Sequence, residues 1–159
     1  MHVLRPAAKS TVQAASWLAL LLPLMAISSP LWAEEPVPIE QILEDPRLYH
    51  LRHVTMLGVA RDVTPLHPYK LQNEQVCYGA YLFKLEDETG VMSVAVLGLC
   101  GRPLVKDPDI EDGQRVEVSA TIQAPSHGGY YLSFQGLQVV REEEGFVQAV
   151  ATRILPVIE

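Results

Sequence analysis

Two histidines are the leading candidates for metal chemistry in this chain. His50 and His53 have the spacing H-x-x-H, and imidazole nitrogens are common zinc ligands. A zinc site needs at least three protein ligands, and the sequence offers no third ligand at a suitable spacing. We therefore interpret the pair as polar residues at a junction between a helix and a strand, and we predict no metal site.

The other candidate groups also lack the partners that their chemistry requires. Ser126 and His127 are adjacent, but neighbours on an extended loop point apart, and no acid is placed to orient the imidazole. An acidic run has neither the glycine nor the final glutamate of a calcium-binding loop; its carboxylates are Asp107, Asp109, Glu111 and Asp112. The sequence therefore predicts no catalytic residue, no cofactor and no enzyme, and it leaves weak cation binding by the acidic run as an open alternative.

Residues 1–33 have the features of a secretory signal peptide. A basic start with Arg5 and Lys9 precedes an apolar run, and a small residue, Ala33, stands before two acids. An uncleaved anchor would need roughly 20 apolar residues to cross a bilayer, whereas this run is shorter and contains Pro23. We therefore expect cleavage after Ala33, a periplasmic or secreted protein, and no membrane anchor in the mature chain.

The chain is acidic, with 12 Lys and Arg against 19 Asp and Glu and a formal net charge of −7. Loss of Arg5 and Lys9 with the leader would lower the net charge from −7 to −9. Polyanion binding gains affinity from cations gathered in one patch, but the basic residues after the leader are scattered along the sequence. This balance disfavours nucleic acid as a partner.

A change of apolar period divides the mature chain into helical ends and a central run of strands. Residues 34–38 contain two prolines, which favour an extended spacer. Residues 39–45 place apolar side chains on one helical face, and Pro46 ends the helix. Residues 141–159 are predicted to form a C-terminal helical tail, because apolar residues recur every four positions from Phe146. Whether that helix docks on the domain or binds a partner stays open.

Between these ends, apolar residues alternate with a period of two, which indicates consecutive antiparallel strands. Gly58 and Gly136 fall inside two of the strands, where glycine suits a bulge or a corner of a barrel. Five strands are predicted, over Val54–Val63, Gly79–Asp87, Val91–Leu97, Gln114–Ile122 and Tyr130–Val140.

The turn at residues 87–90 fixes the register of the hairpin around it. With that centre, apolar residues face one another across the core side of the hairpin; the pairs are Tyr81 with Val96, Phe83 with Val94 and Leu85 with Met92. The opposite side carries a mixed set of side chains that would be partly open to a partner. The same register places Cys77 opposite Cys100, close enough for a disulfide in an oxidising compartment, with two reduced thiols as the alternative.

The stretch Tyr81-Leu82-Phe83-Lys84-Leu85-Glu86-Asp87-Glu88-Thr89-Gly90-Val91 resembles that of nucleic-acid-binding-like OB-fold domains. The resemblance covers residues 39–140 and implies an all-β, five-stranded Greek-key barrel; in size and predicted export the chain is also similar to small acidic OB proteins of the bacterial envelope. OB barrels bind ligands across their second and third strands and adjoining loops. The implied ligand-binding residues are Tyr78, Leu82, Lys84, Tyr69, His127 and Tyr130.

We therefore expect a non-enzymatic exported module that binds a protein, a peptide or a small ligand in the cell envelope. Single-stranded nucleic-acid binding is the first alternative, although the predicted outer face carries one cation, Lys84, and few aromatics. A divalent-cation-binding or enzyme-accessory protein of the envelope is the second alternative.

Overall fold

The structure is a computed structural model that describes residues 35–103, 108–124, 129–140 and 146–158. The chain divides into two compact units, Met1–Trp32 and Ala33–Glu159. The first unit, and with it the predicted signal peptide, lies outside the described residues. Among the described residues, no helix is long and apolar enough to cross a membrane.

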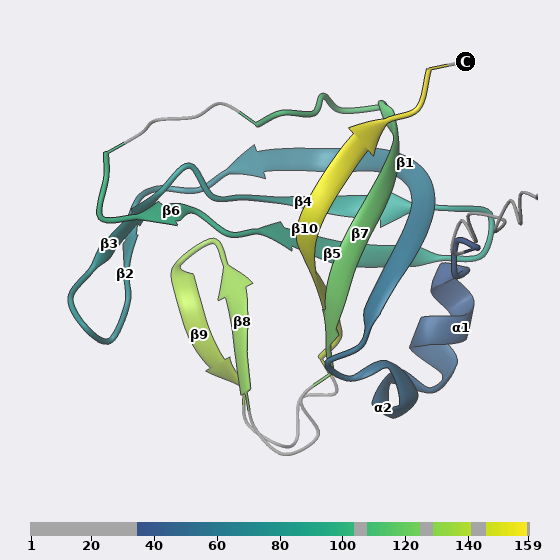
Figure 1. The fold of residues 1–159 in the computed structure, drawn as a ribbon, viewed down its shortest axis with the longest axis horizontal. Coiled ribbons are helices and arrows are strands. Elements are labelled where there is room, and N and C mark those ends of the chain that lie inside the picture. Colours follow the sequence, from purple (N-terminus) through teal and green to yellow (C-terminus); the bar gives the residue numbers. More distant parts are fainter. Residues whose placement is uncertain (1–34, 104–107, 125–128, 141–145, 159) are drawn as a thin grey trace, which may run out of the picture. The chain divides into compact units, whose positions relative to one another are not determined.

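Five strands close into a barrel in the second unit (Figure 1). Their order around the barrel is β1-β4-β5-β10-β7, in which β10 runs parallel to β5 and every other neighbouring pair is antiparallel. This is the Greek-key arrangement of the OB fold, so the predicted fold class is confirmed. The strands are β1 (His53–Pro65), β4 (Tyr81–Glu86), β5 (Val91–Val96), β7 (Arg115–Gln123) and β10 (Gln148–Pro156).

The alternating apolar residues of these strands form the core inside the barrel. The β4–β5 hairpin has the predicted register, so its inward side chains face one another as expected, and Phe83 is 2% exposed. Strand β1 serves both sides of the barrel by pairing first with β7 and then with β4, and it changes partner at Val59. The neighbouring Gly58 is required there, because a Cβ atom would lie 2.6 Å from the Glu86 carbonyl oxygen.

The prediction of a C-terminal helix was wrong. Residues 148–156 form the last barrel strand, β10, and not a helix. A spacing of four residues is one turn of a helix but also two repeats of a strand, and the bulge between Ala151 and Arg153 further obscures the strand period. The start of the predicted helical tail, residues 141–145, lies outside the described residues.

The predicted fifth strand, Tyr130–Val140, is instead a separate hairpin. It consists of β8 (Gly129–Ser133) and β9 (Gly136–Val140), which pair only with each other. Gly136 has a φ of +98°, a conformation that glycine adopts without strain, so the chain reverses here rather than bending within one strand. The barrel is closed by β10 in its place.

One end of the barrel is covered by α1 (Ile39–Glu44), which is followed by the single turn α2 (Pro46–Tyr49). The predicted N-terminal helix is confirmed, and its two core residues, Ile39 and Ile42, are fully buried. The predicted spacer is already in contact with the barrel at Val37, whose N–H donates to the Thr55 carbonyl oxygen at 2.8 Å.

Asp87 in the β4–β5 turn holds α1 in place. Its Oδ1 accepts hydrogen bonds from the backbone N–H groups of Thr89 and Gly90 at 2.7 and 2.8 Å, and its Oδ2 accepts from the N–H of Ile39 at 2.9 Å. Pro38, at the N-cap, makes no side-chain cap of its own. The Asp-x-Thr-Gly stretch therefore has a structural role, because it closes a turn and caps a helix that lies far away in sequence.

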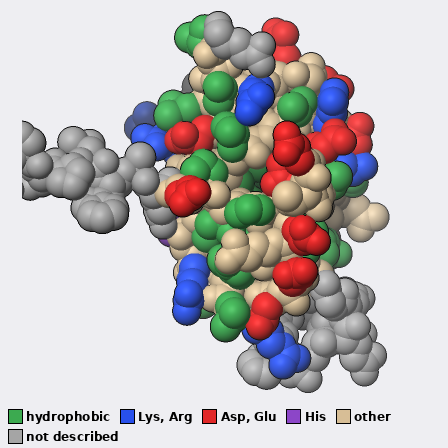
Figure 2. Space-filling model, turned by 90° about the vertical axis from the view of Figure 1, so that its right-hand side faces the viewer, with side chains coloured by type: hydrophobic (Ala, Val, Ile, Leu, Met, Phe, Trp, Pro, Cys, Tyr) green, Lys and Arg blue, Asp and Glu red, His purple; other side chains and the backbone are tan. Residues whose placement is uncertain are grey.

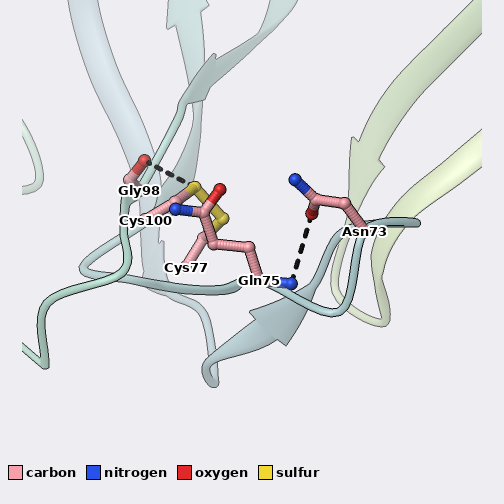
Figure 3. The surroundings of a disulfide bond; sticks show 5 residues. All are labelled: Asn73, Gln75, Cys77, Gly98 and Cys100. Atoms are coloured by element: carbon pink, nitrogen blue, oxygen red, sulfur yellow. Dashed lines mark hydrogen bonds between the residues drawn. A yellow bond between two sulfur atoms is a disulfide. The ribbon is translucent and has the colours of Figure 1, made fainter.

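A small second sheet is formed by β2 (Tyr69–Lys70), β3 (Val76–Tyr78) and β6 (Leu99–Cys100). Cys77 and Cys100 face each other in this sheet with Cα atoms 3.9 Å apart, and they form the predicted disulfide (Figure 3). The bond links the β1–β4 connection to the continuation of β5 beyond Val96.

Candidate functional site

Part of the outward face of β4 and β5, where OB barrels bind ligands, is buried in this protein, whereas Lys84, Glu86 and Val91 on the same face are exposed. Leu82 is 7% exposed and Ala95 is fully buried. They belong to a second apolar cluster that includes Leu132 from β8, with Leu137 from β9 packed against it. The β8–β9 hairpin thus covers this part of the β4–β5 face with side chains of its own.

A buried glutamine fixes the hairpin to the barrel. Gln148, at the start of β10, is 1% exposed, and its side-chain amide pairs with the backbone of Leu132. The Leu132 N–H donates to Gln148 Oε1 at 2.9 Å, and Gln148 Nε2 donates to the Leu132 carbonyl oxygen at 3.0 Å. The Gln148 side chain satisfies the N–H and C=O groups of Leu132 as a neighbouring strand would. The hairpin is therefore held on the barrel by specific hydrogen bonds as well as by apolar contacts.

The turn end of the hairpin packs against Tyr69 of β2. A Cβ atom on Gly136 would lie 2.9 Å from the Tyr69 Cβ, so the absence of a side chain permits this close approach. Burial raises the pKa of the Tyr69 hydroxyl, and a hydrogen bond with the backbone of Gly98 offsets part of that rise. Tyr69 is therefore a packing residue between the hairpin and the chain at Gly98.

The structure separates the implied binding residues into buried and exposed ones. Leu82 and Tyr69 lie in the covered cluster, and Tyr78 is half-buried opposite Leu99. Tyr130 is exposed, and its hydroxyl accepts a hydrogen bond from Gln72 Nε2 at 3.1 Å. Four of the implied residues thus lie around the small sheet and the hairpin. His127 lies outside the described residues.

Lys84, the remaining implied residue, is directed toward β1. Its Nζ lies 2.7 Å from Asp62 Oδ2, and the hydrogen bond and charge of that carboxylate raise the pKa of Lys84. Asp62 sits at the irregularity in β1 and has a φ of +54°. The one cation on the predicted binding face is therefore engaged in an ion pair.

Other cations of the barrel and of the small sheet also lie beside carboxylates. Arg61 Nε is 2.9 Å from Glu86 Oε2, and further pairs join Lys70 to Glu74 and Arg153 to Glu117. Figure 2 shows acidic and basic side chains interspersed over the face it presents. Grooves for single-stranded nucleic acid combine a basic track with exposed aromatics, and these paired charges provide no such track.

Several apolar side chains of the β8–β9 hairpin and of residues 97–99 remain exposed. Phe134, in the turn of the hairpin, is 69% exposed, and Leu99 of β6 is 60% exposed. Grouped exposed apolar side chains are a common mark of protein-binding surfaces. We call the following set the hairpin rim: Leu97, Leu99, Tyr130, Phe134 and Val139.

The residues considered first for metal chemistry have structural partners. His50 Nδ1 accepts a hydrogen bond from the N–H of Ala124 at 3.1 Å, which joins α2 to the end of β7. Asp112 Oδ1 accepts from the N–H of Val63 at 3.2 Å. Within the described ranges, no three His, Cys, Asp or Glu side chains gather as a metal site would require; Asp107 lies outside those ranges.

A groove that sequence reasoning missed lies over the middle of β1, beside the β4–β5 turn. Its volume is about 530 Å³, within the range of ligand-binding clefts. Leu57, Gly58 and Val59 contribute to its lining, and Pro36, Val37 and Pro38 also line it. The charged residues around it are Arg61, Glu86, Asp87, Glu88 and Arg115. The sequence predicts Gly58 only as a bulge or a corner of the barrel, and nothing in its spacing indicates a groove.

No protein-family model and no curated protein matches this chain. An aspartyl tRNA synthetase from Entamoeba histolytica is similar in structure, with a TM-score of 0.50 and 12% identity over 83% of this chain. The second OB-fold domain of replication protein A from Methanococcus maripaludis matches with a TM-score of 0.43 and 12% identity, over 69% of this chain and 88% of that domain. The chain spans 23% of the synthetase, and identity this low shows the fold alone.

Proposed function

We propose that this chain is a non-catalytic binding module of the cell envelope that recognises a protein or peptide partner through the hairpin rim. The observation that carries the proposal is the covered part of the β4–β5 face, where Leu132 is buried in one cluster with Leu82 and Ala95 and Leu137 packs against that cluster. The exposed apolar residues of the hairpin rim lie on the β8–β9 hairpin and in residues 97–99. Two of them are strongly exposed: Phe134 in the hairpin turn and Leu99 in β6.

Single-stranded nucleic acid is the competing ligand class. Its binding to OB barrels uses the face that the hairpin covers here. An acidic chain also repels a polyanion unless its cations are gathered, and four of the cations here lie beside carboxylates. These two features favour a protein or peptide over nucleic acid.

The envelope location rests on residues 1–33, which have signal-peptide features, and on the disulfide, which is typical of an oxidising compartment. The intact mass of the protein from the envelope fraction tests it. We expect a chain that begins at Glu34 and lacks the two hydrogens of the Cys77 and Cys100 thiols. A full-length chain with reduced thiols, found in the cytoplasm, would contradict the proposed location.

Site-specific photocrosslinking in cells tests the binding surface. A photoreactive amino acid at Phe134 or Leu99 should give one discrete crosslinked partner, and the same amino acid at Leu48, an exposed apolar residue of α2, should not. A fluorescent single-stranded oligonucleotide titrated at low salt should show no saturable binding. Saturable binding that weakens as salt rises would replace the protein-binding proposal with the nucleic-acid alternative.

A further inference from the structure

The groove over β1 contains an incomplete rung of the sheet at Leu57. Even-numbered residues of β1 bond to β7, as the pairing of Ala60 N–H with the Gln114 carbonyl oxygen at 2.8 Å shows. The backbone groups of odd-numbered residues consequently point to the opposite edge. At that edge Thr55 accepts from Val37, and Val59 pairs with Glu86.

Leu57 lies between these two partners. The continuing register would place Glu88 opposite Leu57, but β4 ends at Glu86 and the chain turns away. The sheet pairing therefore provides the N–H and C=O of Leu57 with no partner on this edge among the described residues. Leu57 lines the groove, so the gap in the ladder opens into that groove.

The lining of the groove around Leu57 is partly apolar and carries more negative than positive charges. Leu57 and Val59 are half-buried, and Val37 and the two prolines beside it line the groove with them. Of the charged lining residues, three are carboxylates and two are guanidinium groups. Partial burial, which would raise the pKa of Asp87, is outweighed by hydrogen bonds from Thr89, Ile39 and Gly90 that lower it, so the carboxylate is ionised at neutral pH. A ligand with a positive charge complements this lining.

We propose that the β1 groove binds a short extended peptide of another protein, which fills the missing rung at Leu57 and carries a basic group next to an apolar one. Extended peptides commonly bind by adding main-chain hydrogen bonds at an open sheet edge. This site goes beyond the proposed function at the hairpin rim, and the two surfaces share no residue.

The open rung is tested first in the free protein by amide hydrogen exchange. The Leu57 N–H should exchange at least about tenfold faster than the N–H groups of Met56 and Gly58, which are paired with β7. Equal protection of all three amides would show that Leu57 already has a partner and would overturn the proposal.

Peptide binding is tested with a phage-displayed library of random linear peptides selected on the full chain. Selected peptides should be basic, should slow exchange of the Leu57 amide, and should bind Val59→Arg at least about tenfold more weakly. Glu88→Lys should weaken binding in the same direction, whereas Val139→Arg, at the hairpin rim, should leave it unchanged. Failure to select any peptide, or equal binding to Val59→Arg, would refute the groove and leave the proposal for the rim standing.

Discussion

Two outer faces of the same barrel differ in whether another part of the chain covers them. On the β4–β5 face, the β8–β9 hairpin buries Leu82 and Ala95 and satisfies its own backbone through Gln148. On the β1 face, a groove leaves Leu57 half-exposed with an incomplete rung of the ladder. The same barrel forms both faces, so the difference comes from the segments that connect its strands. Those segments, and not the fold, decide where a binding site lies.

The largest expected difference between the faces is in the cost of removing an apolar side chain. Leu132→Ala should lower the free energy of unfolding by about 3 to 4 kcal/mol, because it leaves a cavity under the hairpin. Leu57→Ala should cost less than about 1 kcal/mol, because that side chain is half-exposed already. Urea unfolding of both variants measures this. Equal costs would mean that the hairpin does not bury the β4–β5 face.

Reduction of the disulfide should have the next largest effect. The bond closes a loop with a sequence separation of 23 residues, for which the chain-entropy estimate is about 3 kcal/mol. Thermal unfolding with and without reductant should therefore show a clear drop in Tm, and the double variant Cys77→Ala/Cys100→Ala should reproduce it. An unchanged Tm would show that the small sheet beside the hairpin does not depend on the bond.

Loss of the Gln148 amide should have a smaller effect, confined to the covered face. Gln148→Leu leaves the buried N–H and C=O of Leu132 without partners, which costs about 2 kcal/mol. The amide protons of β8 should then exchange faster relative to those of β1. The matched variant Gln72→Leu removes an exposed hydrogen bond to Tyr130 and should change stability by less than about 0.5 kcal/mol.

The smallest expected loss of stability is that of a substitution at Asp87, beside the groove. Partial burial, which alone would raise its pKa, is outweighed by hydrogen bonds from Thr89, Ile39 and Gly90, so the pKa lies below the ordinary value of 3.8. A lowered pKa means that the stabilisation is present above the unfolded-state pKa and is lost as pH falls through the folded-state pKa. Asp87→Ala should cost about 1 kcal/mol at neutral pH.

Chemical unfolding across the acid range checks the sign of this effect. The stabilities of Asp87→Ala and the wild type should converge as pH falls below about 3.8. Glu88→Ala, at the next and exposed position, should show no such convergence. Convergence on raising the pH instead would contradict the role of Asp87 as an ionised cap.

Local patterns predicted the elements that a turn or an alternation defines. The β4–β5 register and the Cys77–Cys100 pair follow from the position of one turn, because the side-chain period of a strand fixes every pair around it. The first four barrel strands follow from apolar alternation for the same reason. None of these inferences needed information from distant parts of the chain.

Long-range partners decided the elements that were missed. The strand β10 is defined by its pairing with β7 and β5, which no local spacing reveals. Leu82 was expected to be open to a partner because the hairpin that covers it was read as a barrel strand. The groove exists because β4 ends at Glu86, before it reaches the position opposite Leu57. The sequence alone does not show how β1 and β4 are aligned, so it does not predict this gap.

NMR distances in solution can show directly whether the hairpin buries Leu82 and Ala95 on the β4–β5 face. Nuclear Overhauser effects from the methyl groups of Leu132 to side chains of its buried cluster, which includes Leu82 and Ala95, together with slow exchange of the Leu132 amide, are expected. Absence of these contacts with an unprotected Leu132 amide would contradict the account, because the face would then be open to a ligand.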